Sequence, residues 1–176
     1  MRTSVDPPAL TGEDVRCLPD PVLGQRCAEV DPLAADVVAL GAAMLALMSA
    51  SPACVGVAAP QVGVGWRVFV LDVTGHRKAR TQHGALVLAN PRVVERTGED
   101  VAREGCLSVP DLTGDVPRAS GIVVAAVEVG TGRRRVVEAD AFEARALQHE
   151  IDHLDGLLFL DRVRTPAGLH QRKRYA

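Results

Sequence analysis

Aromatic residues, isoleucine, lysine and cysteine are all scarce in this sequence. It contains three phenylalanines, one tryptophan, one tyrosine, two isoleucines and two lysines, whereas alanine, valine and arginine occur 25, 26 and 18 times. We read this bias as background composition, which indicates no function. Four cysteines in 176 residues are too few for a secreted domain held together by disulfide bonds. We therefore expect at least one of them to serve metal binding or catalysis.

The sequence also lacks a strong excess of one charge and a long uninterrupted hydrophobic run. Twenty basic residues face 22 acidic ones, which gives no electrostatic reason to expect a nucleic-acid-binding or polybasic membrane protein. The stretch from Met1 to Pro8 has no apolar segment of the kind that a signal peptide requires. The most apolar region, residues 33–50, is interrupted by Asp36 and stops at Ser51 and Pro52. We therefore expect a cytoplasmic protein, with no DNA or membrane as partner.

Length and composition indicate one globular domain over residues 1–176. The length falls within the range of single domains, and a hydrophobic content of 47% is typical of a folded chain. The first 30 residues are rich in proline, aspartate and glycine, so we expect surface turns there. The C-terminal end carries a short basic tail, which consists of Arg162, Arg164, Arg172, Lys173 and Arg174.

Two helices and several strands are predicted from the hydrophobic pattern. The first helix starts with Asp31 as N-cap and ends at Pro52. Short valine-rich segments follow and predict strands at 67–73, 85–89, 91–96, 122–129 and 133–139, with a hairpin turn at 130–132. The second helix covers Ala141–Leu154, with Glu143 as capping-box partner and Gly156 as C-cap. The predicted fold class is α+β, with antiparallel or mixed sheets packed around a central C-terminal helix.

The predicted second helix carries the pattern H-E-x-x-H, formed by His149, Glu150 and His153. Residues four apart lie on one helical face, so both imidazoles can bind one metal ion while Glu150 takes a proton from an activated water. The alternative is two hydrogen-bonded histidines beside a solvated glutamate. That alternative is costly in a helix expected to be buried.

A catalytic metal also needs a third protein ligand. The extended pattern H-E-x-x-H-x-x-G-x-x-H fails because Phe159 occupies its last position, and no glutamate follows Glu150. Spacing alone does not choose among the remaining candidates, although for Cys17 and Cys27 we prefer the role of small buried hydrophobes. Those candidates include Cys17, Cys27, Cys54, Cys106, His76, His83, Asp155, Asp161 and His170.

Three segments together resemble the signature motifs of peptide deformylases, in the order of that family. They are Cys54-Val-Gly-Val-Ala-Ala-Pro-Gln61, Glu104-Gly-Cys-Leu-Ser108 and Gln148-His-Glu-Ile-Asp-His153. The resemblance covers about residues 15–163. It implies removal of the formyl group from the initiator methionine of nascent chains. It also implies one divalent metal ion, with iron(II) as the native metal and zinc(II) or nickel(II) as substitutes.

Position by position, the resemblance also implies the roles of single residues. The metal ligands would be Cys106, His149 and His153, and Glu150 would be the general base or acid. Gln61 and the backbone N–H of Leu107 would stabilise the oxyanion. The backbone around Gly56, Val57 and Gly105 would bind the peptide as an added strand. The chain departs from the family at Cys54, where glycine is usual, and at Val57, where leucine is commoner.

Other functions remain open on the residues alone. They are a zinc peptidase of another H-E-x-x-H lineage, a deformylase relative with a different formylated substrate, and a binding module with a structural metal. The basic tail is either a solvated end or a contact for ribosomal RNA, which would suit an enzyme of nascent chains.

Overall fold

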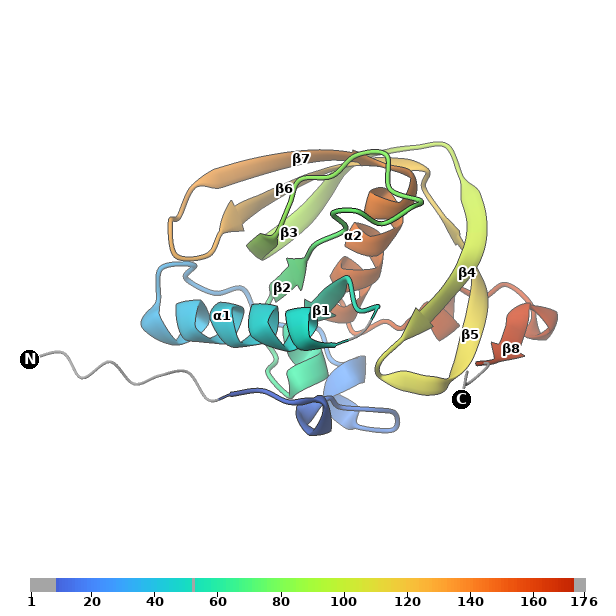
Figure 1. The fold of residues 1–176 in the computed structure, drawn as a ribbon, viewed down its shortest axis with the longest axis horizontal. Helices are drawn as coiled ribbons and strands as arrows, with labels where there is room; N and C mark the ends of the chain where they lie inside the picture. Colours follow the sequence, from blue (N-terminus) through green and yellow to red (C-terminus); the bar gives the residue numbers. More distant parts are fainter. Residues whose placement is uncertain (1–8, 52, 173–176) are drawn as a thin grey trace, which may run out of the picture.

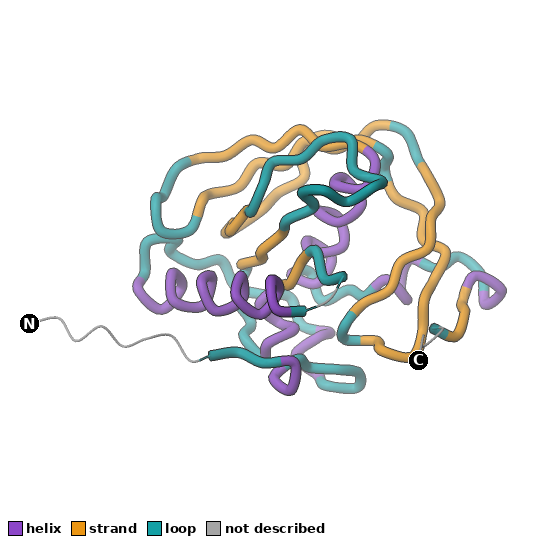
Figure 2. The backbone as a smooth tube through the Cα atoms, viewed as in Figure 1, coloured by secondary structure: helices purple, strands orange, loops and turns teal. Residues whose placement is uncertain are grey.

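The structure is a computed structural model, and it describes residues 9–51 and 53–172. Within these ranges the chain forms two α-helices and two antiparallel sheets, joined by loops and short 3₁₀ turns (Figures 1 and 2). The predicted combination of helices with antiparallel sheet is therefore confirmed.

The larger sheet has five strands in the order β1-β2-β3-β6-β7. Its strands are β1 (Gly56–Ala58), β2 (Val68–Leu71), β3 (Leu86–Thr97), β6 (Gly121–Glu128) and β7 (Arg134–Asp140). Strands β6 and β7 form the expected hairpin, in which Gly130 and Gly132 adopt positive φ angles of 83° and 68°. The strands predicted at 85–89 and 91–96 are one strand, β3, with irregular register near residue 90.

The two helices cover opposite faces of this sheet. Helix α1 (Ala35–Ala50) packs with Val68 and Val70, whereas α2 (Ala141–Leu154) packs with Phe69 and Leu71. All four residues of β2 are buried, because side chains alternate between two covered faces. In Figure 1, α2 lies between the large sheet and the smaller one.

The smaller sheet has three strands in the order β4-β5-β8. It consists of β4 (Asp100–Cys106), β5 (Val109–Arg118) and β8 (Leu169–Gln171). Its own core is small and contains five buried apolar residues, Cys106, Val109, Val116, Leu158 and Phe159. Strands β1 and β4 are edge strands of their sheets, so each has a backbone edge that can accept a further strand.

Two predicted caps are wrong. Helix α1 begins at Ala35, because Asp31 instead caps a turn by accepting a hydrogen bond from Leu33 N at 2.9 Å. Helix α2 has the predicted bounds, and Gly156 adopts the expected positive φ of 76°. However, Glu143 does not close a capping box, because its carboxylate accepts hydrogen bonds from the backbone and ring of His83.

The basic residues expected in a C-terminal tail have different environments. Arg162 forms an ion pair with Asp152 at 2.7 Å, and Arg164 forms one with Glu99 at 2.7 Å. Arg172 follows β8, while positions 173 and 174 lie outside the described residues. Among the described helices, none is both long and apolar enough to cross a membrane.

Candidate metal centre

The candidate metal centre lies where α2 meets the end of β4. The side chains of Cys106, His149 and His153 present ligand atoms that all lie within 4.8 Å of one another. Two of them come from successive turns of α2, and Cys106 is the last residue of β4. Of the candidates for a third ligand, the fold therefore brings Cys106 to the histidine pair.

Both histidines are oriented by neighbouring groups. His149 Nδ1 lies 2.9 Å from Glu104 Oε2, which leaves its Nε2 available to a ligand. His153 Nε2 lies 3.3 Å from Cys106 Sγ. The buried His153 Nδ1 has no hydrogen-bond partner within the described residues.

The electrostatic environment favours a thiolate. Burial raises the pKa of Cys106, but the adjacent His153 and His149 outweigh burial and hold that pKa well below its ordinary value. Burial also lowers the pKa of His149, whereas hydrogen bonds to Cys106 and Glu104 raise it, and the net direction is upward. An anionic sulfur is the form in which cysteine binds metals.

Glu150 points into the same site, next to a glycine of β1. A Cβ atom added to Gly56 would lie 2.5 Å from Glu150 Oε1. The other carboxylate oxygen, Oε2, is buried and has no hydrogen-bond partner within the described residues. Burial raises the pKa of Glu150 to about 7, even though both histidines oppose this shift. A carboxyl group in such surroundings is suited to accept and release a proton.

Gln61 is held by hydrogen bonds against the thiol of Cys106. Its Oε1 accepts a hydrogen bond from Ala58 N at 2.9 Å, which fixes the orientation of the amide. Its Nε2 donates to Cys106 Sγ at 3.3 Å and to Ser108 Oγ at 3.2 Å. The side chain is only 2% exposed. Gln61 therefore presents an amide donor beside the site.

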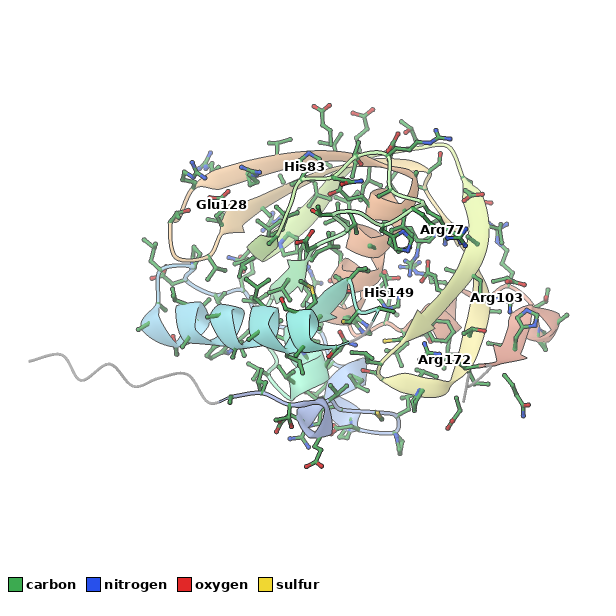
Figure 3. All side chains as sticks on the ribbon, in the orientation of Figure 1. Arg77, His83, Arg103, Glu128, His149 and Arg172 are labelled. Carbon is green, nitrogen blue, oxygen red and sulfur yellow. The ribbon has the colours of Figure 1, made fainter. Side chains whose placement is uncertain are left out.

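A cavity of about 320 Å³ lies between the edge strands β1 and β4, and it is bordered by Gln61, Cys106, His149 and Glu150. Figure 3 shows His149 between the two sheets, with Arg103 and Arg172 on the side of the smaller sheet. The cavity is lined by Ala53, Cys54, Val55, Gly56, Gln61, Arg103, Glu104, Gly105, Cys106, Leu107, Phe142, Arg145, Ala146, His149, Glu150 and Arg172.

The remaining predicted site residues are placed in different ways. Gly56, Gly105 and Leu107 border the cavity, and Leu107 lies in the turn between β4 and β5. Val57 is fully buried, and its side chain packs in the core beneath α1. Its side chain is therefore not available to a ligand, and Val57 does not line the cavity.

Cys54, the residue that departs from the family pattern, does not strain its loop. The positive φ in this loop, 59°, belongs to Ala53. The Cys54 thiol donates a hydrogen bond to Gly56 O at 3.2 Å and lines the cavity. Burial, together with the charge of Glu150, raises the pKa of Cys54 to about 11, so this thiol is protonated near neutral pH.

Sequence reasoning missed the buried charges that support the site. Glu104 accepts hydrogen bonds from Arg118 at 2.9 and 3.0 Å and from Arg145 at 2.8 Å, in addition to its contact with His149. Burial raises the pKa of Glu104, but the hydrogen bonds and charges of His149 and Arg118 outweigh burial and lower the pKa to about 2. Glu104 is thus a carboxylate that orients His149. Its place beside Gly105 and Cys106 in the motif was the available signal.

The donor set fits a catalytic divalent metal. A thiolate and two imidazoles are ligands that zinc(II) and iron(II) both accept. A structural zinc site uses four protein ligands, whereas this group of donors has three. The buried, unpartnered carboxylate oxygen of Glu150 also indicates a group whose partner is not supplied by the described protein.

Comparisons with known proteins identify relatives over most of the chain. The family described as "Polypeptide deformylase" matches residues 13–167. A curated peptide deformylase from Halothermothrix orenii is 42% identical over 149 residues, which make up 85% of this chain and 92% of the relative.

Solved structures show the same likeness. A peptide deformylase from Thermus thermophilus superimposes with a TM-score of 0.77 at 38% identity, covering 87% of this chain and 86% of that one. One from Thermotoga maritima gives a TM-score of 0.76 at 34% identity, covering 86% of this chain and 97% of that one.

Proposed function

Since the chain belongs to the peptide deformylase family, we propose that Cys106, His149 and His153 hold its metal ion and that Glu150 moves the protons of the reaction. The enzyme is a metal-dependent hydrolase that removes the N-formyl group from nascent peptides. These roles rest on one observation: the ligand atoms of the three residues lie within 4.8 Å of one another, beside the buried carboxylate of Glu150.

When bound, the metal supplies Lewis acidity, which makes water nucleophilic near neutral pH and polarises the formyl oxygen. Glu150 takes one proton from the attacking water. It then delivers that proton to the leaving nitrogen of methionine as the C–N bond breaks, so that the N-formyl peptide and water become a free amine and formic acid, which ionises to formate by releasing its proton to water. The missing Cβ of Gly56 leaves the space in which the carboxylate performs this transfer.

Gln61 and Leu107 stabilise the negative charge that develops on the formyl oxygen. The Gln61 amide is fixed by Ala58 N and directs Nε2 towards the site. The backbone N–H of Leu107 is the second donor, in the turn that follows Cys106. Removing one donor of this kind costs about 2.7–4 kcal/mol of transition-state stabilisation in other hydrolases.

The peptide binds as an extended strand between the two sheet edges. Gly56 and Val57 on β1 contribute one backbone edge, and Gly105 on β4 contributes the other. Backbone hydrogen bonds of this type depend little on side chains, which suits an enzyme that must accept many nascent chains.

The identity of the metal, the domain organisation and the location of the protein are further parts of this proposal. We propose iron(II) as the native metal because the family resemblance implies it, with zinc(II) or nickel(II) as substitutes because the mixed thiolate and imidazole donor set suits all three. Residues 1–176 act as a single catalytic domain around the H-E-x-x-H helix. The protein works in the cytoplasm, where formylated chains are made, and it needs neither DNA nor a membrane.

An anaerobic assay tests the proposed function. Iron-loaded enzyme should hydrolyse formyl-Met-Ala-Ser, and Glu150→Gln should lose at least about a hundredfold in kcat while keeping full metal occupancy. Inactive wild-type enzyme with full metal occupancy would refute the function, and active Glu150→Gln enzyme would refute the role of Glu150.

A transient contact with the ribosome is also proposed. Arg162 and Arg164 already have acidic partners, and Arg172 lines the cavity, so Lys173 and Arg174 are the basic residues to test. The double variant Lys173→Gln/Arg174→Gln should co-sediment less with ribosomes at low salt. Unchanged co-sedimentation would exclude this contact.

A further inference from the structure

Three arginines line the cavity, and their environments differ. Arg145 is tied to Glu104 at 2.8 Å, and Arg103 is tied to Asp115 at 2.8 Å. The guanidinium of Arg172 has no hydrogen bond or ion pair with any residue of the described ranges. A cation that is partly removed from water without an anionic partner is available to a charged ligand.

The fold places Arg172 over the peptide-binding edge. Its backbone N–H donates to Asp111 O at 2.8 Å, which continues the pairing of β8 with β5. From there the side chain crosses β5 and ends at Gly105 on β4, where any Cβ would overlap the guanidinium. Thr113, the register partner of Gly105, lies beside it. Glycine at position 105 thus leaves room for the charge of Arg172.

We infer that Arg172 is a specificity-determining residue that selects peptides with an acidic side chain at one of the first two positions after formyl-methionine. This inference rests on the proposed function, because it assumes that the peptide lies along Gly105. Gly105 immediately precedes the ligand Cys106, and an extended peptide advances only about 3.3 Å per residue. The guanidinium therefore meets residues close to the reacting formyl group.

The expected preference is moderate because Arg172 is only partly buried. An ion pair at a partly exposed site supports about a fivefold gain in kcat/KM, and added salt should reduce this gain. The gain should appear in KM, since the guanidinium acts on a side chain and not on the formyl group. A carboxylate is the anion to test, because it can accept two parallel hydrogen bonds from arginine.

Paired amidated peptides isolate the effect. Formyl-Met-Ala-Glu-amide is compared with formyl-Met-Ala-Gln-amide, and formyl-Met-Glu-Ala-amide with formyl-Met-Gln-Ala-amide, so that a side chain carries the sole carboxylate. Wild-type enzyme should prefer glutamate over glutamine about fivefold in one pair. Arg172→Gln should reduce this ratio to about one, whereas Arg172→Lys should retain part of it. Arg164→Gln is the control, since it removes an equal charge from a residue outside the cavity lining.

The outcomes separate the two proposals. The role of Arg172 is overturned if the ratio of kcat/KM between glutamate and glutamine peptides is near one in the wild type at both positions, or if Arg172→Gln leaves that ratio unchanged. In either case, hydrolysis of the glutamine peptides would still support the deformylase function. Failure of metal-loaded wild-type enzyme to hydrolyse any of the four peptides overturns the function itself. Because each variant is judged by a ratio of two substrates, partial misfolding does not imitate the effect.

Discussion

Gly56 and Glu150 share one small volume of the cavity, so a methyl group added at Gly56 would displace the carboxylate that we propose to transfer protons. The carboxylate comes from α2, and the glycine comes from the edge strand β1. A Cβ at Gly56 would lie 2.5 Å from Oε1 and 2.8 Å from the carboxylate carbon of Glu150. Since these distances are shorter than van der Waals contact, the carboxylate would have to move.

Gly56→Ala should therefore lower kcat by about a hundredfold, because a displacement of about 1 Å in a catalytic group can cost that factor. Metal content should stay unchanged, because the atoms nearest to a Cβ at Gly56 all belong to Glu150 and not to the proposed ligands. Steady-state kinetics and metal analysis of the purified variant measure both effects. Gly12→Ala is the matched control, since a Cβ there has no heavy atom within 4 Å. An unchanged kcat in Gly56→Ala would contradict the assigned position of Glu150.

Among single residues, the sequence predicted some members of the candidate site and not others. His149, Glu150 and His153 could be grouped because their helical spacing is local. Cys106 could not be selected by spacing, since 43 residues separate it from His149 and several other candidates existed. Its assignment needed the resemblance to a family. Glu104 was overlooked as a supporting residue, because its role depends on Arg118 and Arg145, which reach it only in the folded chain.

Secondary-structure elements are joined around the site by buried charges. Glu104 on β4 binds Arg118 of β5 and Arg145 of α2. Asp152 of α2 binds the same Arg118, and also Arg162 of the 3₁₀ turn Phe159–Arg162. Removing one member of a buried network leaves its partners with uncompensated charge.

Glu104→Gln should therefore destabilise the protein by about 3–5 kcal/mol, as broken buried ion pairs do elsewhere. Urea denaturation in the presence of a chelator measures this loss apart from any loss of metal. Glu99→Gln provides the comparison, because its pair with Arg164 is exposed on both sides and is worth at most about 1 kcal/mol. Equal effects of the two substitutions would show that the network around Glu104 contributes no special stability.

Helices and strands could be predicted only where the local sequence pattern marks them. Helix α2 was predicted with its bounds because periodic apolar residues and Gly156 both mark it. Strands β4 and β5 were missed, since Glu104, Gly105 and Pro110 do not form the valine-rich alternation used to find strands. They are strands because they pair with one another and with β8, and pairing partners distant in sequence are invisible to a local pattern.

Of the two sheets, the smaller one is packed on the smaller set of buried apolar side chains. The two larger core clusters lie on the faces of the five-stranded sheet, whereas the smaller sheet buries only a five-residue cluster. Its connection to α2 is made by the charges around Glu104 and by the candidate metal centre. A metal bound by Cys106 of β4 and two histidines of α2 would therefore join the smaller sheet to the main core.

Metal removal should loosen this junction more than the rest of the protein. At a metal concentration of about 100 Kd, binding adds about 2.7 kcal/mol of stability, so chelation should lower Tm by about 5–10 °C for a chain of this size. Hydrogen exchange should become faster in β4 and β5, while β2 stays protected between α1 and α2. In Cys106→Ser the chelator should have little effect, because a hydroxyl is a poor substitute for the thiolate. Exchange that increases equally in β2 and β4 would instead mean that the metal stabilises the fold globally, without a particular role at the junction.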